Sequence, residues 1–184
     1  YHQGTITKEG SKMSKSRGNT VSPDEFIEKY GSDTFRAYLM FMGPYDEGGD
    51  WNDKGITGIS RFINKIWKFC HLPNSENETD KKDLQILHQT IRSVTNDLRQ
   101  MKFNTAISRL MECMNHFSGH NDVQSDIKRD IIKIIAPIIP HISEELWEIN
   151  GGENSVFLES FPVYDKSLAE EDTITIAVQV NGRL

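Results

Sequence analysis

Two lysines, Lys12 and Lys15, lie three residues apart in a short run that reads Lys-Met-Ser-Lys-Ser. An ammonium group is a compact positive charge with three hydrogen-bond donors. The hydroxyls of Ser14 and Ser16 and the amide of Asn19 add further donors around the lysines. Residues of these types at this spacing suit the non-bridging oxygens of a polyphosphate, so the run predicts a phosphate-binding loop.

The same composition has a simpler interpretation, because basic and hydroxyl side chains are frequent in solvated loops that bind nothing. A Walker A loop is excluded, since Ser11 separates Gly10 from Lys12 where that motif requires glycine directly before lysine. Gly18 follows the lysines and allows backbone conformations that other residues avoid. We therefore expect a mobile loop of the kind that closes over a substrate and opens again.

The order of the residues, rather than their composition, favours the functional interpretation. From Gly10 to Pro23 the sequence resembles the signature loop of the class I aminoacyl-tRNA synthetases. The resemblance continues at residues 30–36, 51–56, 61–67, 103–107, 136–147 and 178–182. The last stretch, Val-Gln-Val-Asn-Gly, resembles the leucyl family more than the valyl, isoleucyl or methionyl families, which stay as alternatives.

This resemblance implies an aminoacyl-tRNA ligase, and more narrowly a leucine–tRNA ligase. Such an enzyme activates leucine with ATP and transfers it to tRNA(Leu). Mg²⁺ would share the charge of the phosphates. It implies that Lys12 and Lys15 are catalytic, because positive groups at the leaving pyrophosphate stabilise the transition state. It also implies that Met13 holds the loop by packing against neighbouring helices. The residues that would bind ATP are Lys12, Met13, Ser14, Lys15 and Ser16.

The other signature of this class, of the type His-x-Gly-His, does not occur in the chain. The chain also begins within a fold and ends within a segment that resembles a strand. We therefore expect a C-terminal fragment of the enzyme, inactive alone and partnered by the missing Rossmann half of its own chain. The alternative is a stand-alone helical module that binds RNA or protein, in which the lysine loop is incidental.

The apolar periodicity predicts a mainly α protein built on an antiparallel helical bundle, and the resemblance implies a class Ia anticodon-binding-domain-like bundle. Residues 1–22 are expected to be the end of a Rossmann catalytic domain with the lysine loop, and residues 23–55 a connecting helical subdomain. The bundle is expected over 56–150. Residues 151–184 are expected to form a loop and the start of a C-terminal β segment, because residues 173–180 alternate and are rich in β-branched side chains.

Local signals define the first two helices. Ser22 and Pro23 predict a capped helix start, and Gly31 predicts its end in a left-handed conformation. A second helix is expected over residues 32–41, followed by a loop at the next glycines.

One face of the helix expected near residue 59 carries three basic side chains, Arg61, Lys65 and Lys68. Taken singly, each fits a solvated surface residue. Taken together, in a family whose bundle lies along the tRNA, they are candidates for contacts with tRNA phosphates. Trp67 and Trp147 are expected in the core, because an indole buries a large apolar area.

Three potential metal ligands, Cys113, His116 and His120, are closely spaced. Gly119 should end the helix between the histidines, and no fourth ligand is close in sequence. Since a structural zinc site needs four ligands, we expect no metal.

The composition limits the class of protein. With 184 residues, 26% of them charged, the chain fits a globular domain, and its net charge of −6 weighs against a dedicated nucleic-acid-binding domain. Its two cysteines are too few for a disulfide framework. No apolar run approaches the ~20 residues needed to span a membrane. We expect a cytoplasmic protein with no membrane partner.

Overall fold

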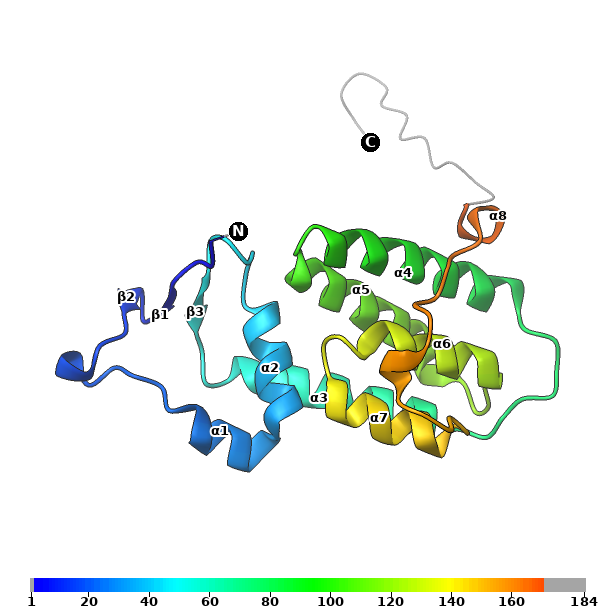
Figure 1. Cartoon of the computed structure of the whole chain (residues 1–184), viewed down its shortest axis with the longest axis horizontal. Coiled ribbons are helices and arrows are strands. Elements are labelled where there is room, and N and C mark those ends of the chain that lie inside the picture. The colour runs from blue at the N-terminus through cyan, green and yellow to red at the C-terminus, as the bar shows by residue number, and fades with distance from the viewer. Residues whose placement is uncertain (1, 171–184) are drawn as a thin grey trace, which may run out of the picture.

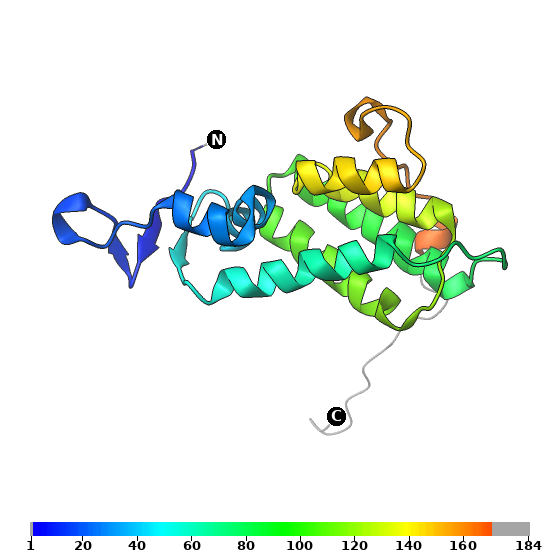
Figure 2. The same ribbon diagram turned by 90° about the horizontal axis from the view of Figure 1, so that it is seen from below.

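The computed structural model describes residues 2–170, so the strand expected at 173–180 lies outside the described residues. A small sheet and the lysine loop form one end of the molecule, and a bundle of helices forms the other (Figures 1 and 2). This arrangement confirms the prediction of a mainly α protein with a helical bundle. Within residues 2–170, no helix combines the length and the apolar character needed to cross a bilayer.

The N-terminal sheet has the strand order β2-β1-β3. Strand β1 (Ile6–Lys8) pairs antiparallel with β2 (Ser11–Lys12) and parallel with β3 (Gly49–Trp51). The turn between β1 and β2 consists of Glu9 and Gly10, with φ of 54° and 69°. Two consecutive positive φ angles are typical of the tight hairpin turns that match the strand twist. The sequence predicted a loop where the structure has β3. The strand was missed because it pairs with β1, which is distant in sequence.

Two helices follow the loop at the residues that the sequence predicted. Helix α1 (Pro23–Tyr30) begins with proline, and α2 (Ser32–Phe41) follows after Gly31. The φ of Gly31 is +86°, but its ψ of 156° lies outside the left-handed helical conformation that was expected. The expected cap is only partly present, since Ser22 occupies the N-cap position but its side chain makes no capping hydrogen bond.

An aromatic cluster ties these two helices to the sheet. The indole of Trp51 in β3 lies 4.8 Å from the ring of Phe26, 5.8 Å from Phe35 and 5.1 Å from Tyr38, measured between ring centroids. Such edge and tilted contacts between aromatic rings are favourable at these distances. The cluster therefore gives the N-terminal region a small core that continues into the main one.

The helical bundle consists of α3 (Gly55–Cys70), α4 (Lys81–Arg99), α5 (Phe103–His116), α6 (Ser125–Ile135) and α7 (Pro140–Ile149). Short helical turns η2 (Phe117–Gly119), η3 (Val156–Leu158) and α8 (Lys166–Ala169) complete it. Its helices pack through apolar faces spaced three and four residues apart, as the periodicity predicted. Isoleucines supply much of the buried surface, and Pro140 begins α7 at a position where its missing N–H has no helical partner.

Polar contacts join α2 to the bundle. The buried carboxylate of Asp33 accepts hydrogen bonds from the backbone N–H of Ile142 and from the His141 ring, both at 2.8 Å. The guanidinium of Arg36 donates to the carbonyls of Ile138 and Pro137 at 3.2 and 3.0 Å. These contacts fix the N-terminal region against the start of α7.

One core prediction is wrong. Trp147 is buried as expected, with 1% of its surface exposed, but Trp67 is 37% exposed and lies against the His71 ring. Helix α3 turns Ile63 and Ile66 toward the core, and Trp67 falls outside the face that they define.

Candidate functional site

The two lysines of the loop have different local settings. Lys12 ends β2, whereas Lys15 begins a single 3₁₀ turn, η1 (Lys15–Arg17). Both side chains are exposed to solvent. Gly18 ends the turn in the left-handed conformation with φ of 66°, which suits glycine. The turn carries the ammonium of Lys15 alone, because Lys12 lies on β2.

Hydrogen bonds within the loop define its shape. The amide oxygen of Asn19 accepts from the backbone N–H of Ser14 at 2.9 Å, and its amide nitrogen donates to the Lys12 carbonyl at 3.3 Å. The hydroxyls of Ser14 and Ser16 lie 3.2 Å apart. The sequence assigned Asn19 to phosphate oxygens, but in this structure its side chain holds the two ends of the loop together.

The base of the loop is fixed to β3. The carboxylate of Asp50 accepts from the Thr7 hydroxyl at 2.6 Å and from the Gly10 N–H at 2.9 Å. These hydrogen bonds, the one from Thr7 first, lower the pKa of Asp50. The hairpin that precedes the lysines therefore has a stable root.

Lys15 borders an open hollow of about 620 Å³ between the loop, α1 and the start of α3. A second basic residue, Lys8 of β1, lines the same hollow, and sequence reasoning did not single it out. Glu25 and Asp53 supply acidic groups to the same lining. Lys12 does not line this hollow, so the structure separates the two predicted lysines. The loop projects from the end of the molecule beside the strands (Figure 2).

Met13 is the loop residue that faces inward. Its side chain is partly buried and packs against the continuous apolar core. This contact gives the loop an apolar attachment next to Lys12, and the packing of Met13 against neighbouring helices stays a prediction.

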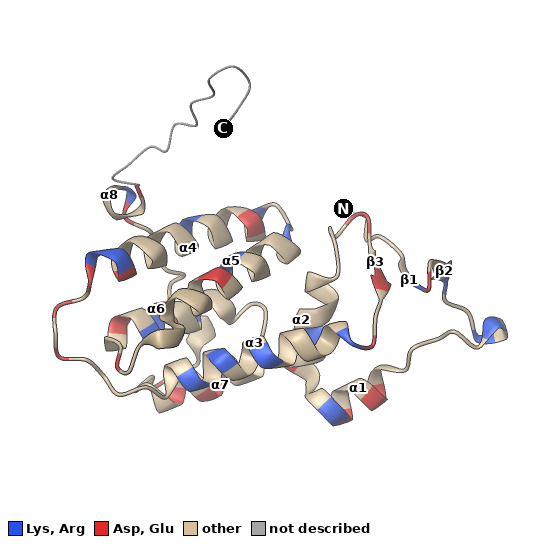
Figure 3. Cartoon of the chain, turned by 180° about the vertical axis from the view of Figure 1, so that it is seen from behind, with Lys and Arg blue, Asp and Glu red and all other residues tan. Residues whose placement is uncertain are grey.

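The three predicted basic residues of α3 share one groove. Arg61, Lys65 and Lys68 all line a groove of about 530 Å³, and basic positions follow α3 as blue bands in Figure 3. The ammonium of Lys65 donates to the Asn115 side chain of α5 at 2.7 Å, so this lysine also joins the two walls. The remaining lining residues are Asn64, Phe69, Leu72, Met114, Phe117, Ser118 and His120. The groove thus offers positive charge beside apolar and imidazole surface.

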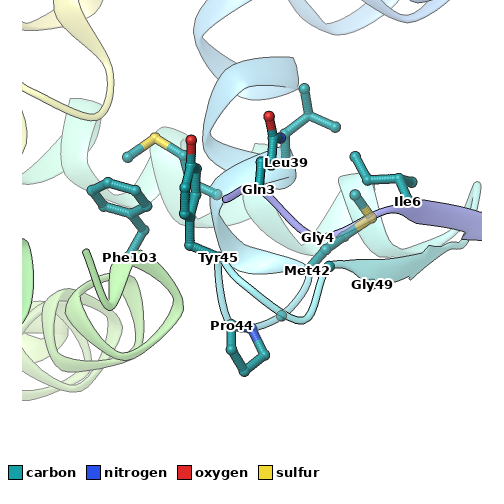
Figure 4. Close-up of a pocket in the computed structure, with 12 residues that line it drawn as sticks. Gln3, Gly4, Ile6, Leu39, Met42, Pro44, Tyr45, Gly49 and Phe103 are labelled. Atoms are coloured by element: carbon teal, nitrogen blue, oxygen red, sulfur yellow. The ribbon is translucent and has the colours of Figure 1, made fainter. Parts of the chain in front are cut away.

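A second hollow lies where the sheet, α2 and α5 meet (Figure 4). Tyr45 and Phe103 make an edge contact there, with ring centroids 5.7 Å apart. The hollow measures about 100 Å³, and apolar side chains and glycines make up most of its lining. It is a packing gap between the N-terminal region and the bundle and offers little chemistry.

The predicted cluster of Cys113, His116 and His120 divides in the structure. Cys113 faces the core, and burial raises the pKa of its thiol to about 12, so it is a poor ligand. The two imidazoles instead converge on Asp83 of α4, which sequence reasoning missed. Asp83 precedes His116 by 33 residues, and nothing in a single sequence connects them.

Comparisons with known proteins match both regions. The family described as tRNA synthetases class I (I, L, M and V) matches residues 1–52, and the anticodon-binding domain of tRNA ligase matches residues 80–184. A leucine–tRNA ligase of Caldanaerobacter subterraneus subsp. tengcongensis is 45% identical, and one of Petrotoga mobilis is 42% identical, each across 100% of this chain.

A solved structure has the same fold. It is the ternary complex of Agrobacterium radiobacter K84 agnB2 LeuRS-tRNA-LeuAMS, with a TM-score of 0.83 and 28% identity over 100% of this chain and 26% of that chain. The chain spans about a quarter of the length of the curated relatives, since the alignments cover 25% of each. These matches favour the leucyl family over the valyl, isoleucyl and methionyl alternatives. The chain therefore belongs to the anticodon-binding domain family of tRNA ligases and corresponds to a region of the leucyl-tRNA synthetases.

Proposed function

We propose that this chain serves a leucine–tRNA ligase in two ways. Its lysine loop stabilises the phosphates of ATP while leucine is activated, and the basic groove on α3 contacts tRNA(Leu). The full-length enzyme would use ATP, Mg²⁺, leucine and tRNA(Leu). The comparison with the LeuRS-tRNA-LeuAMS complex supports this proposal, because a tRNA is bound in that protein.

The chemistry requires positive charge but no nucleophile from this chain. A carboxylate oxygen of leucine attacks the α-phosphorus of ATP, and the bond between that phosphorus and the bridging oxygen of the β-phosphate breaks. Pyrophosphate leaves and leucyl-adenylate remains. A tRNA hydroxyl then attacks the carbonyl carbon of the leucyl group, the bond from that carbon to the phosphate oxygen breaks, and AMP and the hydroxyl proton are released. Negative charge grows on the leaving group, so an ammonium placed there lowers the barrier. Mg²⁺ would share this charge when bound.

The observation that carries the proposal is the setting of Lys15. It is exposed, it lies on a single turn that ends at Gly18, and it borders a hollow that also contains Lys8. Glu25 and Asp53 also line this hollow, so the binding of a polyphosphate there would depend on the two ammonium groups turning toward the phosphates rather than on a net positive lining. Lys12 lies nearby on β2 and would reach the phosphates only after the loop moves.

The test is leucine-dependent pyrophosphate exchange by the full-length enzyme. Lys15→Ala should lower the exchange rate by roughly a hundredfold, comparable to losing one preorganised donor at a transition-state charge. Arg17→Ala is the matched control, because Arg17 is an exposed cation on the same turn that does not line the hollow. An unchanged rate for Lys15→Ala would refute the catalytic role.

The groove on α3 is the proposed tRNA contact. Arg61, Lys65 and Lys68 line it together, and the exposed indole of Trp67 lies on the same helix. Phosphate contacts release counterions, so removing one should flatten the salt dependence of binding by about one unit of slope. Lys68→Ala should therefore weaken tRNA binding by the full-length enzyme and reduce the slope. Lys82→Ala on α4, an exposed lysine outside the groove, should change neither.

The chain lacks the other signature motif of the class I synthetases. The sequence has no His-x-Gly-His motif, so the isolated chain should show no leucine-dependent pyrophosphate exchange. Measurable exchange by the pure chain would show that leucine activation does not need that motif. We also propose a cytoplasmic location, because both cysteines are free thiols in the core, as a reducing compartment permits.

A further inference from the structure

We propose that Asp83, His116 and His120 form a binding site for a divalent transition-metal ion, with Zn²⁺ as its reference ion. The site lies where the first turn of α4 meets the end of α5 and the short turn η2. It is separate from the lysine loop and does not rest on the proposed function.

The donor atoms already converge. The Nε2 atom of His116 lies 2.6 Å from Oδ1 of Asp83, and Nε2 of His120 lies 3.1 Å from Oδ2 and 3.2 Å from Oδ1. One ligand atom from each residue falls within 4.8 Å of the others. Donors about 2.0–2.1 Å from a tetrahedral zinc lie about 3.3 Å from each other. Seating an ion would therefore require Nε2 of His116 and Oδ1 of Asp83 to move apart by about 0.7 Å, whereas Nε2 of His120 already lies near that spacing from the carboxylate.

The chemistry of the donors selects the class of metal. Two imidazoles and one carboxylate suit zinc, cobalt or nickel, whereas calcium and magnesium prefer oxygen ligands throughout. Three protein ligands leave at least one coordination position for water, which distinguishes this site from a closed four-ligand structural site. The sequence argument against a metal required a fourth ligand close in sequence. An open site does not need one.

Access and charge also fit an ion. The Asp83 side chain is 10% exposed, while those of His116 and His120 are 26% and 29% exposed, so the carboxylate lies beneath two imidazoles that reach solvent. An ion can therefore enter from the imidazole side. His120 also lines the basic groove, and a divalent ion beside one carboxylate would leave that wall of the groove with net positive charge.

A purely structural role is the competing explanation. In that case Asp83 only accepts hydrogen bonds from the two imidazoles and thereby ties α4 to the end of α5. The two explanations differ in one measurable property, because hydrogen bonds alone create no saturable affinity for zinc.

The test is calorimetric titration of this chain with ZnCl₂ at pH 7.5. We expect one ion per chain, and His120→Ala should weaken the affinity on the order of tenfold or more. His71→Ala is the matched control, since it removes a solvent-exposed imidazole directly after α3, whose ring contacts the Trp67 carbonyl and not the cluster. Failure of the wild-type chain to bind zinc, or equal affinity in His120→Ala, would overturn the proposal.

A second variant guards against misfolding. Asp83→Asn keeps a carbonyl oxygen that accepts from the imidazoles but loses the charge that a metal needs. With native circular dichroism, this variant should lose zinc affinity by a similar factor, and Co²⁺ should no longer give the visible absorption expected of the wild-type site. Retention of the cobalt spectrum in folded Asp83→Asn would also overturn the proposal.

Discussion

The lysine loop and the helical bundle are held in shape by different interactions. Among the described residues 11–20 none is buried, and Asn19 closes the loop through two hydrogen bonds. The bundle has a continuous core in which Ile91, Ile131 and Ile134 are fully buried. A few exchangeable hydrogen bonds permit local opening, whereas burial of many apolar side chains couples helices into one cooperative unit. The part proposed to act on ATP is thus free to move on a fixed support.

The junction between the lysine loop and the helical bundle is held as firmly as the bundle. Through partly buried hydrogen bonds, Asp33 of α2 contacts the start of α7 and Arg36 contacts the residues just before it. The aromatic cluster around Trp51 then extends this rigidity to β3. Motion of the loop should therefore be confined to residues 11–22, from the short edge strand β2 to the start of α1.

The largest effect should come from the bundle core. Trp147→Ala should lower the free energy of unfolding by about 3–5 kcal/mol, because it removes a fully buried indole. The same change also removes contacts with the Arg129 guanidinium, 4.5 Å from the ring centroid, and the Lys133 ammonium, 5.4 Å away. Urea denaturation monitored by circular dichroism measures the loss.

A second tryptophan supplies the control. Trp67→Ala removes the same side chain from a position that is 37% exposed, so its cost should be less than about 1 kcal/mol. Equal losses for Trp67 and Trp147 would show that burial does not decide stability in this bundle. Gly152→Ala offers a further check, because an added Cβ would lie 2.1 Å from the Trp147 indole nitrogen.

An intermediate effect is expected at the junction. Asp33→Ala should cost about 1–3 kcal/mol, since it leaves the backbone N–H of Ile142 without its buried acceptor. Glu28→Ala, an exposed acidic residue of α1, is the control and should cost much less. If both variants unfold at the same urea concentration, the junction does not contribute to the cooperative unit.

Sequence reasoning predicted most of the fold because the relevant signals were local. Pro23 and Gly31 mark the ends of α1, and apolar spacing marks the bundle helices. It predicted a loop where the structure has β3. This strand forms because Gly49 pairs with Ile6, and no local pattern in the sequence indicates that contact. Trp67 was misplaced for a related reason, because apolar character alone does not say which face of α3 meets the core.

The candidate sites were predicted to different degrees. Arg61, Lys65 and Lys68 share a groove because their spacing on one helix fixes their relative positions. Lys8 and Asp83 were missed, since each reaches its site through tertiary contacts with residues distant in sequence. A single sequence records the spacing within an element but not the meeting of two elements.

A smaller effect should depend on pH. Burial raises the pKa of Asp130 in α6, with Lys133 and His88 partly opposing the shift and Asp126 adding to it. The native state therefore binds this proton more tightly than the unfolded chain, so stability falls as pH rises from the ordinary pKa through the raised one. Asp130→Asn should stabilise the chain at pH 7, and the gain should vanish below the ordinary pKa. Thermal melts at pH 7 and pH 3 measure this difference, and a gain that persists at pH 3 would exclude the desolvated carboxylate as its cause.

The smallest effect should come from the residue with the largest proposed catalytic role. Lys15→Ala in this chain should change the free energy of unfolding by less than about 0.5 kcal/mol, because the side chain is exposed and the loop closes through Asn19 instead. Urea denaturation of Lys15→Ala and Asn19→Ala side by side measures this, with the second variant expected to perturb the loop more. A loss above about 1 kcal/mol for Lys15→Ala would place the lysine in the scaffold. The loop would then contribute to stability as the bundle does. The hundredfold loss of pyrophosphate exchange proposed for Lys15→Ala in the enzyme would follow from damage to the structure.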